Sequence, residues 1–233
     1  MEKKNILNGI KGKLIVSCQA LDGEPLHGSC YMAKMAKAAK QGGAAAIRAN
    51  SKEDIMAIKK ETNLPVIGIV KRNYQDSDVY ITATLKEVKE LIEAGTDIIT
   101  LDATLRRRPD GVLLEELITY IRTHSSALIM GDVSTVDEGI AAVRLGFDIL
   151  STTLSGYTEY SPSLKGPDFQ LVSDLVKKCE IPVLAEGRIS TPSEAKEAFE
   201  RGAFAVVVGS AITRPQLITK GFADALEECQ YQS

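Results

Sequence analysis

Short runs of apolar residues, rich in valine and isoleucine, recur along the chain, and polar residues and then a helical pattern follow each run. The runs are continuous rather than alternating in polarity, which is typical of strands that helices cover on the outside. Eight runs of this kind occur, over residues 14–19, 44–50, 65–71, 98–103, 127–133, 149–154, 182–188 and 204–210. The pattern therefore predicts eight strands separated by helices.

The segments between the runs carry residues that typically begin and end helices. Thr84 stands before one helical pattern as an N-cap, and Thr191-Pro192 combines a cap with a proline in the first turn. Glycines close helical patterns at Gly95, Gly146 and Gly202, each shortly before the next apolar run. Because a helix that crosses from one strand to the next makes the two strands parallel, these joins predict repeated βα units.

Eight βα units in 233 residues predict a closed (β/α)8 barrel, the TIM-barrel fold, as a single domain over residues 1–233. An open, doubly wound sheet is the alternative, but such a sheet typically has about five or six strands and a glycine-rich dinucleotide turn after the first one. No G-x-G-x-x-G motif follows the first run. The sequence thus favours the barrel and indicates no dinucleotide cofactor.

Composition and charge narrow the classes of partner. A net charge of −3, without a basic stripe that also carries aromatic residues, indicates no nucleic-acid binding. No apolar run is long enough to span a membrane, and the charged residues 1–12 do not form a secretory signal. The cysteines lack a C-x-x-C pair or a histidine at metal-ligand spacing, and they are Cys18, Cys30, Cys179 and Cys229. We therefore expect a cytoplasmic protein with reduced thiols and no nucleic-acid or membrane partner.

Polar and charged residues stand at the end of every predicted strand. The active site of a TIM barrel lies at the carboxyl ends of its strands, so these residues are expected to share one rim. Any one of them could simply face solvent, but the set as a whole predicts an active site. The set consists of Gln19, Arg48, Asn50, Lys71, Arg72, Asp102, Asp132, Thr152, Thr153, Glu186, Arg188, Gly209 and Ser210.

Two glycine-containing turns predict a phosphate site. Gly187-Arg188 follows the seventh run, and Gly209-Ser210 follows the eighth and leads into a helical segment. TIM barrels often hold a substrate phosphate between these two loops with backbone N–H groups, and glycine lets the backbone come close to the anion. Ordinary glycine turns are the alternative interpretation. The order of the two turns after the last two strands favours a phosphorylated substrate.

Lys71 is the first candidate for chemistry. It ends an almost uncharged strand, so its amine is expected to point into the mouth of the barrel. Partial desolvation and the neighbouring Arg72 are expected to lower its pKa, which would make a neutral amine accessible near physiological pH. Such a lysine can act as a general base or as a Schiff-base nucleophile, or it can simply hold an anionic substrate.

Two carboxylates accompany this lysine at the rim. Glu186 lies beside the predicted phosphate loop and could bind a sugar hydroxyl or move a proton, and Asp132 could be its partner or could orient Lys71 by charge. Together with Asp102 they could in principle gather around a divalent ion. The cations at the same rim argue against this, so we expect no metal site.

The strand-end motifs resemble those of the N-acetylmannosamine-6-phosphate 2-epimerase family. The resemblance extends along nearly the whole chain, although residues 161–166 do not match clearly. The motifs are specific to this family when taken together, whereas no single motif is. The motifs lie at residues 15–20 (IVSCQA), 24–27 (EPLH), 43–50, 65–72 (PVIGIVKR), 80–84 (YITAT), 101–104 (LDAT), 152–158 (TTLSGYT), 185–188 (AEGR) and 209–215 (GSAITRP).

The resemblance implies interconversion of N-acetylmannosamine 6-phosphate and N-acetylglucosamine 6-phosphate in the catabolism of sialic acid, without a cofactor. It implies that Lys71 is the acid/base at C2 and that Glu186 assists ring opening and proton handling. Whether the lysine serves both faces of C2 or Glu186 serves the second stays open. The residues implied to contact the sugar or phosphate are Gln19, Arg48, Asp132, Thr153, Tyr157 and Arg214.

Two other functions are also compatible with the sequence. A Schiff-base aldolase or lyase acting on a phosphorylated sugar would use a strand-end lysine equally well. A sugar-phosphate sensor on an inactive barrel is weaker, because the acid/base residues are all present. The resemblance also implies a homodimer. The C-terminal helical segment, residues 214–229, could pack on its own barrel or exchange with that of a neighbour.

Overall fold

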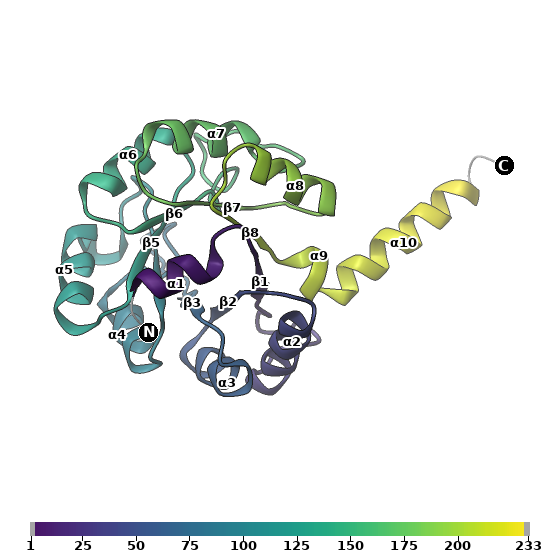
Figure 1. The fold of residues 1–233 in the computed structure, drawn as a ribbon, viewed down its shortest axis with the longest axis horizontal. Helices are drawn as coiled ribbons and strands as arrows, with labels where there is room; N and C mark the ends of the chain where they lie inside the picture. Colours follow the sequence, from purple (N-terminus) through teal and green to yellow (C-terminus); the bar gives the residue numbers. More distant parts are fainter. Residues whose placement is uncertain (1–2, 231–233) are drawn as a thin grey trace.

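The structure is a computed structural model and describes residues 3–230. Its parallel strands pair in chain order, and the last pairs with the first, so that the sheet closes into a barrel (Figure 1). The strands are β1 (Leu14–Cys18), β2 (Ala46–Asn50), β3 (Val66–Ile69), β4 (Ile98–Asp102), β5 (Leu128–Asp132), β6 (Ile149–Ser151), β7 (Val183–Glu186) and β8 (Ala205–Val208). Each predicted run contains one of them, which confirms the (β/α)8 barrel over the open sheet.

A helix connects each strand to the next and lies on the outside of the barrel (Figure 1). These helices are α2 (Ser29–Gln41), α3 (Lys52–Thr62), α4 (Leu85–Glu93), α5 (Leu114–His124), α6 (Val136–Arg144), α7 (Phe169–Lys178) and α8 (Pro192–Glu200), with the short 3-10 helix η1 (Pro109–Gly111) before α5. Helices α4, α6 and α8 begin with a capping box, in which a threonine and a glutamate three residues later satisfy free N–H groups of the first turn.

Apolar side chains form two layers, one inside the barrel and one between the strands and the helices. Ile67, Ile98 and Leu184 belong to the inner layer, and α1 (Lys3–Ile10) closes the amino-terminal end of the barrel by packing Ile6 and Ile10 against it. Successive side chains of a strand point to opposite faces. Because both faces are buried, the apolar runs in the sequence are continuous.

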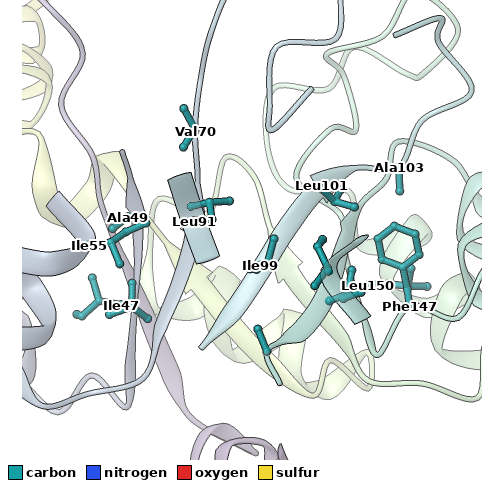
Figure 2. Packing of buried hydrophobic residues seen from close by; sticks show 14 of the residues in the cluster. Ile47, Ala49, Ile55, Val70, Leu91, Ile99, Leu101, Ala103, Phe147 and Leu150 are labelled. Carbon is teal, nitrogen blue, oxygen red and sulfur yellow. The ribbon is translucent and has the colours of Figure 1, made fainter. Parts of the chain in front are cut away.

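The outer layer is visible in Figure 2. Strand residues and residues of the surrounding helices and loops meet there, and all are buried. The labelled members are Ile47, Ala49, Ile55, Val70, Leu91, Ile99, Leu101, Ala103, Phe147 and Leu150. This layer holds the helices at fixed positions around the strands, and it thereby fixes the loops that leave the carboxyl ends of the strands.

The C-terminal helix does not pack on its own barrel. After β8 the chain forms the short helix α9 (Ser210–Thr213) and then α10 (Pro215–Gln230), which projects away from the other helices (Figure 1). Phe222 and Leu226 of α10 are 73% and 69% exposed. Of the two arrangements expected for this segment, packing on its own barrel is therefore not the one adopted. Within residues 3–230, no helix is both long enough and apolar enough to cross a membrane.

Gly68 in β3 is a site of close packing between the strand and two helices. A Cβ atom at this position would lie 2.6 Å from Thr96 Cγ2, 2.8 Å from Ile55 Cδ1 and 2.9 Å from Leu91 Cδ2. All three neighbours are buried, so they have little room to move. The absence of a side chain at Gly68 lets α3 and α4 approach the barrel just below the site of Lys71.

We expect the substitution Gly68→Ala to lower the free energy of unfolding by about 1–3 kcal/mol, because the added methyl group overpacks the outer layer. Urea unfolding followed by circular dichroism measures this change. Gly9→Ala in α1 is the control, since no atom lies within 4 Å of its Cβ position. The control should be as stable as the unsubstituted protein or more so. Equal stability of the two variants would contradict the packing argument.

Candidate active site

A cavity of about 620 Å³ opens at the carboxyl ends of the strands. Most of the residues predicted for the rim line it. Asp132 does not, because it is fully buried where it pairs with Arg48, and neither do Asn50, Arg72, Asp102 and Thr152. The predicted residues in its wall are Gln19, Arg48, Lys71, Thr153, Tyr157, Glu186, Gly187, Arg188, Gly209, Ser210 and Arg214. The structure therefore brings together residues that are up to 195 positions apart in the sequence, from Gln19 to Arg214.

Arg48 forms the floor of the cavity together with two carboxylates. Its Nη2 lies 2.5 Å from Asp132 Oδ2, and its Nη1 donates to Asp132 Oδ1 at 3.1 Å and also to Glu186 Oε2. Thr153 Oγ1 lies 3.0 Å from both Asp132 Oδ1 and Glu186 Oε2 and joins the two acids. Only 1% of the Arg48 side chain is exposed. Strands β2, β5 and β7 are thus linked across the barrel through one guanidinium.

Burial and charge shift the pKa values of this cluster. Burial disfavours the charge of Arg48, but the charges of Asp132 and Glu186 outweigh this effect and raise its pKa above the ordinary range. Burial also raises the pKa of Glu186, and the nearby charge of Asp132 adds to the increase, while Arg48 opposes it. Glu186 can therefore hold a proton more readily than an ordinary glutamate, which suits an acid that exchanges a proton with a ligand.

Lys71 follows β3 and lies largely inside the cavity. Burial, the charge of Arg48 and the charge of Arg214 lower its pKa to about 8. The backbone N–H of Lys71 donates to Asn50 Oδ1 at 2.8 Å, which fixes the chain where the lysine leaves the strand. A substantial fraction of neutral amine is thus present near pH 8, as the sequence predicts.

The expected role of Arg72 in this shift is wrong. Its guanidinium pairs with Glu87 and lies 3.0 Å from Glu90 Oε1, both on α4, and it contributes none of the main effects on Lys71. Successive residues at a strand end point to opposite sides, so the neighbour of an inward lysine points outward. The cations that act on Lys71 are instead Arg48 and Arg214, which are distant in sequence.

The two glycine turns lie side by side at the mouth of the cavity. Gly187 has a φ of 114°, a conformation that favours glycine, and Gly209 stands directly before α9. Arg188 has a φ of 56°, and its side chain binds the β6–α7 loop. Its Nε donates to Gly166 O at 2.8 Å, and its Nη1 donates to Ser155 O at 2.6 Å. In this structure the guanidinium therefore binds carbonyl groups of that loop.

Arg214 reaches the cavity from the start of α10. Its Nη2 lies 3.2 Å from Glu24 Oε2, and Gln216 Nε2 donates to Glu24 Oε1 at 3.3 Å. Glu24 also accepts from the backbone N–H of Leu21 at 2.7 Å. The β1–α2 loop, which carries Glu24, is thus tied to the first turn of α10. Gln19 is the first residue of this loop, and its Nε2 donates to Ser17 Oγ at 2.9 Å.

Asp102 stands apart from the other predicted acids. Its side chain accepts from Thr104 Oγ1 at 2.6 Å and pairs with Arg106 at 2.7 Å, and it does not line the cavity. Across the described part of the chain, no three side chains of His, Cys, Asp or Glu are placed to hold a metal ion. Cys18, Cys30 and Cys179 are free thiols, and the side chain of Cys229 lies outside the described residues.

Sequence reasoning missed Asn73 and Tyr80, which also line the cavity. Neither lies at a strand end. They come from the β3–α4 connection, which folds back beside Lys71 through an isolated antiparallel bridge between Lys71 and Ile81. Nothing in the spacing of the apolar runs indicates such a bridge. In the sequence only the YITAT motif, residues 80–84, marks this segment, and the motif does not by itself indicate a chemical role.

Comparison with known proteins places this site in a family. A family model described as "Putative N-acetylmannosamine-6-phosphate epimerase" matches residues 32–228. The chain belongs to the N-acetylmannosamine-6-phosphate 2-epimerase family. The "Putative N-acetylmannosamine-6-phosphate 2-epimerase" of Clostridioides difficile is 58% identical over 222 residues, which are 95% of this chain and 99% of that protein. The protein of the same name from Caldanaerobacter subterraneus is 54% identical, over 98% of this chain and 97% of its own length.

A solved structure agrees with the sequence relatives. The N-acetylmannosamine-6-phosphate 2-epimerase from Clostridium perfringens matches this member of the epimerase family with a TM-score of 0.94 and 55% identity, over 97% of this chain and 98% of that one. Thiamine phosphate pyrophosphorylase from Pyrococcus furiosus, at 18% identity and a TM-score of 0.60, over 90% of each chain, shares the fold alone. The family resemblance that the strand-end motifs predict is therefore confirmed.

In this epimerase-family protein we expect Lys71 to titrate near pH 8, because burial and two arginine charges disfavour its ammonium form. The ¹³C-methyl signals of reductively methylated lysines, followed against pH, measure this value. Lys71→Arg identifies the signal by its loss. Arg214→Gln should move the midpoint to higher pH, since one of the repelling charges is removed. A Lys71 signal with a midpoint between about pH 10 and 11, the range of ordinary lysines, would contradict the expectation.

Proposed function

We propose that the protein is an isomerase, an N-acylglucosamine-6-phosphate 2-epimerase, which interconverts N-acetylmannosamine 6-phosphate and N-acetylglucosamine 6-phosphate in amino-sugar and sialic acid catabolism. The single observation that carries the proposal is a partly buried lysine of lowered pKa in a cavity that also holds Glu186 and Arg48. Relatives named as putative N-acetylmannosamine-6-phosphate 2-epimerases, at 54% and 58% identity, support it over the Schiff-base aldolase or lyase.

The proposed reaction begins with ring opening, because the C2 proton is acidic only when C1 is a free aldehyde. Glu186 would exchange a proton with the ring oxygen, and its raised pKa supports a protonated form that can donate. The buried partners Arg48 and Thr153 hold its carboxylate in one orientation. A fixed orientation of the acid lowers the entropy lost in the reactive complex.

Neutral Lys71 then removes the C2 proton. The electrons of the C2–H bond form the C1–C2 double bond, and the carbonyl electron pair moves to O1. The charge that develops on O1 is stabilised by the cations at the floor and wall, namely Arg48, Arg214 and the newly formed ammonium of Lys71. Return of the proton from Lys71 to the other face of C2, after rotation about the C2–C3 single bond, inverts the centre. The oxidation state is unchanged, so the step requires no redox cofactor.

The remaining site residues are proposed to hold the substrate. Gln19, Asp132, Thr153 and Tyr157 would contact the sugar, either directly or, for the buried Asp132, through the groups it orients. The phosphate would lie against the turns after β7 and β8, where the backbone of Gly187 and Gly209 can approach it closely. The phosphate-binding residues proposed here are Gly187, Arg188, Gly209 and Ser210.

The test is proton NMR of the protein with N-acetylmannosamine 6-phosphate in D₂O. We expect the gluco epimer to appear with deuterium at C2, because the removed proton exchanges with solvent. Lys71→Met should lower the rate by about 10²–10⁴-fold, which is the usual contribution of a general base. Lys86→Met on the surface of α4 is the matched control and should retain the full rate.

Two outcomes would contradict the proposal. Folded protein that forms neither epimer nor deuterated sugar would exclude the reaction. Reductive trapping of a covalent adduct between Lys71 and the sugar with borohydride would favour the Schiff-base lyase instead.

We also propose a cytoplasmic homodimer in which a second copy covers α10. Ile218, Phe222 and Leu226, at successive intervals of four residues, form an exposed apolar stripe on this helix. Between the helix and the barrel lies a groove of about 570 Å³, lined mainly by apolar residues that include Ile189 and Ile218. Contiguous apolar surface of this kind is typical of a protein interface. Exchange of α10 between two copies would bury both the stripe and the groove.

The double substitution Phe222→Asp and Leu226→Asp should convert the proposed dimer into a monomer, because a charged stripe opposes burial. Sedimentation velocity gives the mass directly. Glu227→Gln, a polar change on the same helix, is the control and should leave the mass unchanged. A monomeric unsubstituted protein, or a dimer that survives the two aspartates, would exclude this interface.

A further inference from the structure

The β3–α4 connection folds back beside Lys71 and carries a tyrosine into the cavity. The backbone N–H of Arg72 donates to Tyr80 O at 2.9 Å, and that of Thr82 donates to Val70 O at 2.8 Å. Lys71 and Ile81 form the bridge between these two bonds. The same short hairpin therefore presents both the lysine and Tyr80 to the cavity.

Packing fixes the ring of Tyr80. The side chain is partly buried against Ile69, Ile81 and Leu154, an apolar cluster that lies between the ends of β3 and β6. None of the side chains that the structure describes hydrogen-bonds to its hydroxyl, so the phenol can bond to a ligand in the cavity. Burial, together with the charge of Asp132, raises the pKa of the phenol. The hydroxyl therefore stays protonated, and able to donate, at the pH at which Lys71 becomes neutral.

The proposed reaction restricts where the substituents of the sugar can lie. Lys71, from β3, must reach the proton on C2, whereas the phosphate on C6 is assigned to the turns after β7 and β8. These two regions face each other across the barrel (Figure 1). The acylamino group is attached to C2 and thus lies away from the phosphate, on the side of the cavity that the hairpin covers.

The wall on this side suits a small neutral group. Apart from Lys71, its lining residues are uncharged, namely Ile69, Asn73, Tyr80 and Ile81. The other tyrosine of the cavity, Tyr157, lies near enough to Tyr80 to help raise the pKa of that phenol, but it suits the acyl group less well. The guanidinium carbon of Arg188 is 5.9 Å from the centre of its ring, which places Tyr157 beside the proposed phosphate loops. Tyr157 is also 55% exposed, so it offers a less enclosed surface than the packed ring of Tyr80.

We propose that Tyr80 binds the N-acyl group of the substrate and determines which acyl groups are accepted. The ring lies against the methyl group, and the hydroxyl donates a hydrogen bond to the acyl carbonyl oxygen. Tyr80 is a specificity-determining residue in this arrangement and takes no part in moving the C2 proton. The inference rests on the proposed epimerase function, and it adds a subsite to the residues already assigned there.

The test compares kcat/KM for the N-acetyl, N-propanoyl and N-butanoyl forms of mannosamine 6-phosphate. In Tyr80→Ala, loss of the ring opens the subsite, and the ratio of kcat/KM for the butanoyl to the acetyl substrate should rise at least about tenfold, the scale on which apolar pockets discriminate added methylenes. In Tyr80→Phe the ratio should stay as in the unsubstituted protein, while KM rises about tenfold for all three substrates, since only the bond to the carbonyl is lost.

A role in substrate selection differs from a structural role in its readouts. The pH midpoint assigned to Lys71 should stay within about 0.3 units in Tyr80→Phe, because the hydroxyl is neutral there and makes no bond to the lysine. Tyr31→Ala, an exposed change in α2 outside the cavity, is the control and should leave the ratio and each KM unchanged.

Each outcome decides one of the two proposals. Unsubstituted protein that turns over none of the three sugars would overturn the epimerase function, and the acyl subsite with it. Normal turnover with an unchanged acyl ratio in Tyr80→Ala, or an unchanged KM in Tyr80→Phe, would overturn the subsite alone. The conservative phenylalanine variant keeps the test valid if the alanine variant fails to fold.

Discussion

The guanidinium of Arg48 holds two carboxylates together in the mouth of the barrel, and the arrangement of the site depends on this contact. Removal of one partner of a buried ion pair typically costs about 3–5 kcal/mol, because it leaves an unpaired charge out of water. Asp132 and Glu186 can approach each other only while Arg48 lies between them. The same positive charge lowers the pKa of Lys71. The positions of the two carboxylates and the pKa of Lys71 therefore both depend on Arg48.

The barrel makes such a cluster possible because closure turns every second strand residue inward. Arg48 lies opposite Ser17 in the register of β1 and β2, and Asp132 lies opposite Asp102 and Ser151 in the neighbouring strands. Below this level the barrel is filled with aliphatic side chains, and α1 closes its lower end. The charged layer is thus dry underneath and open to solvent only at the cavity. Low local polarity strengthens the electrostatic effect of Arg48 on Lys71.

The fold and the ring of site residues could be predicted from sequence, because both follow from local patterns. Continuous apolar runs indicate buried parallel strands, and residues at their carboxyl ends must share one rim. The outward direction of Arg72 follows from the alternation of strand side chains, but its partners Glu87 and Glu90 could not be predicted, because they lie on a helix that follows later in the sequence. Tyr80 escaped notice for a similar reason, because an isolated bridge rather than a periodic strand carries it into the cavity.

The side chains that join the loops were also beyond the reach of sequence patterns, and they connect the site to the C-terminal helix. Glu24 binds Arg214 and Gln216, which flank the start of α10, while its own loop contributes Leu21 to the cavity wall. Arg214 in turn lowers the pKa of Lys71. The orientation of α10 and the charge around the lysine therefore share one carboxylate. Any contact that fixes the first turn of α10 also fixes Arg214, so a partner that covered this exposed helix would also affect the pKa of Lys71.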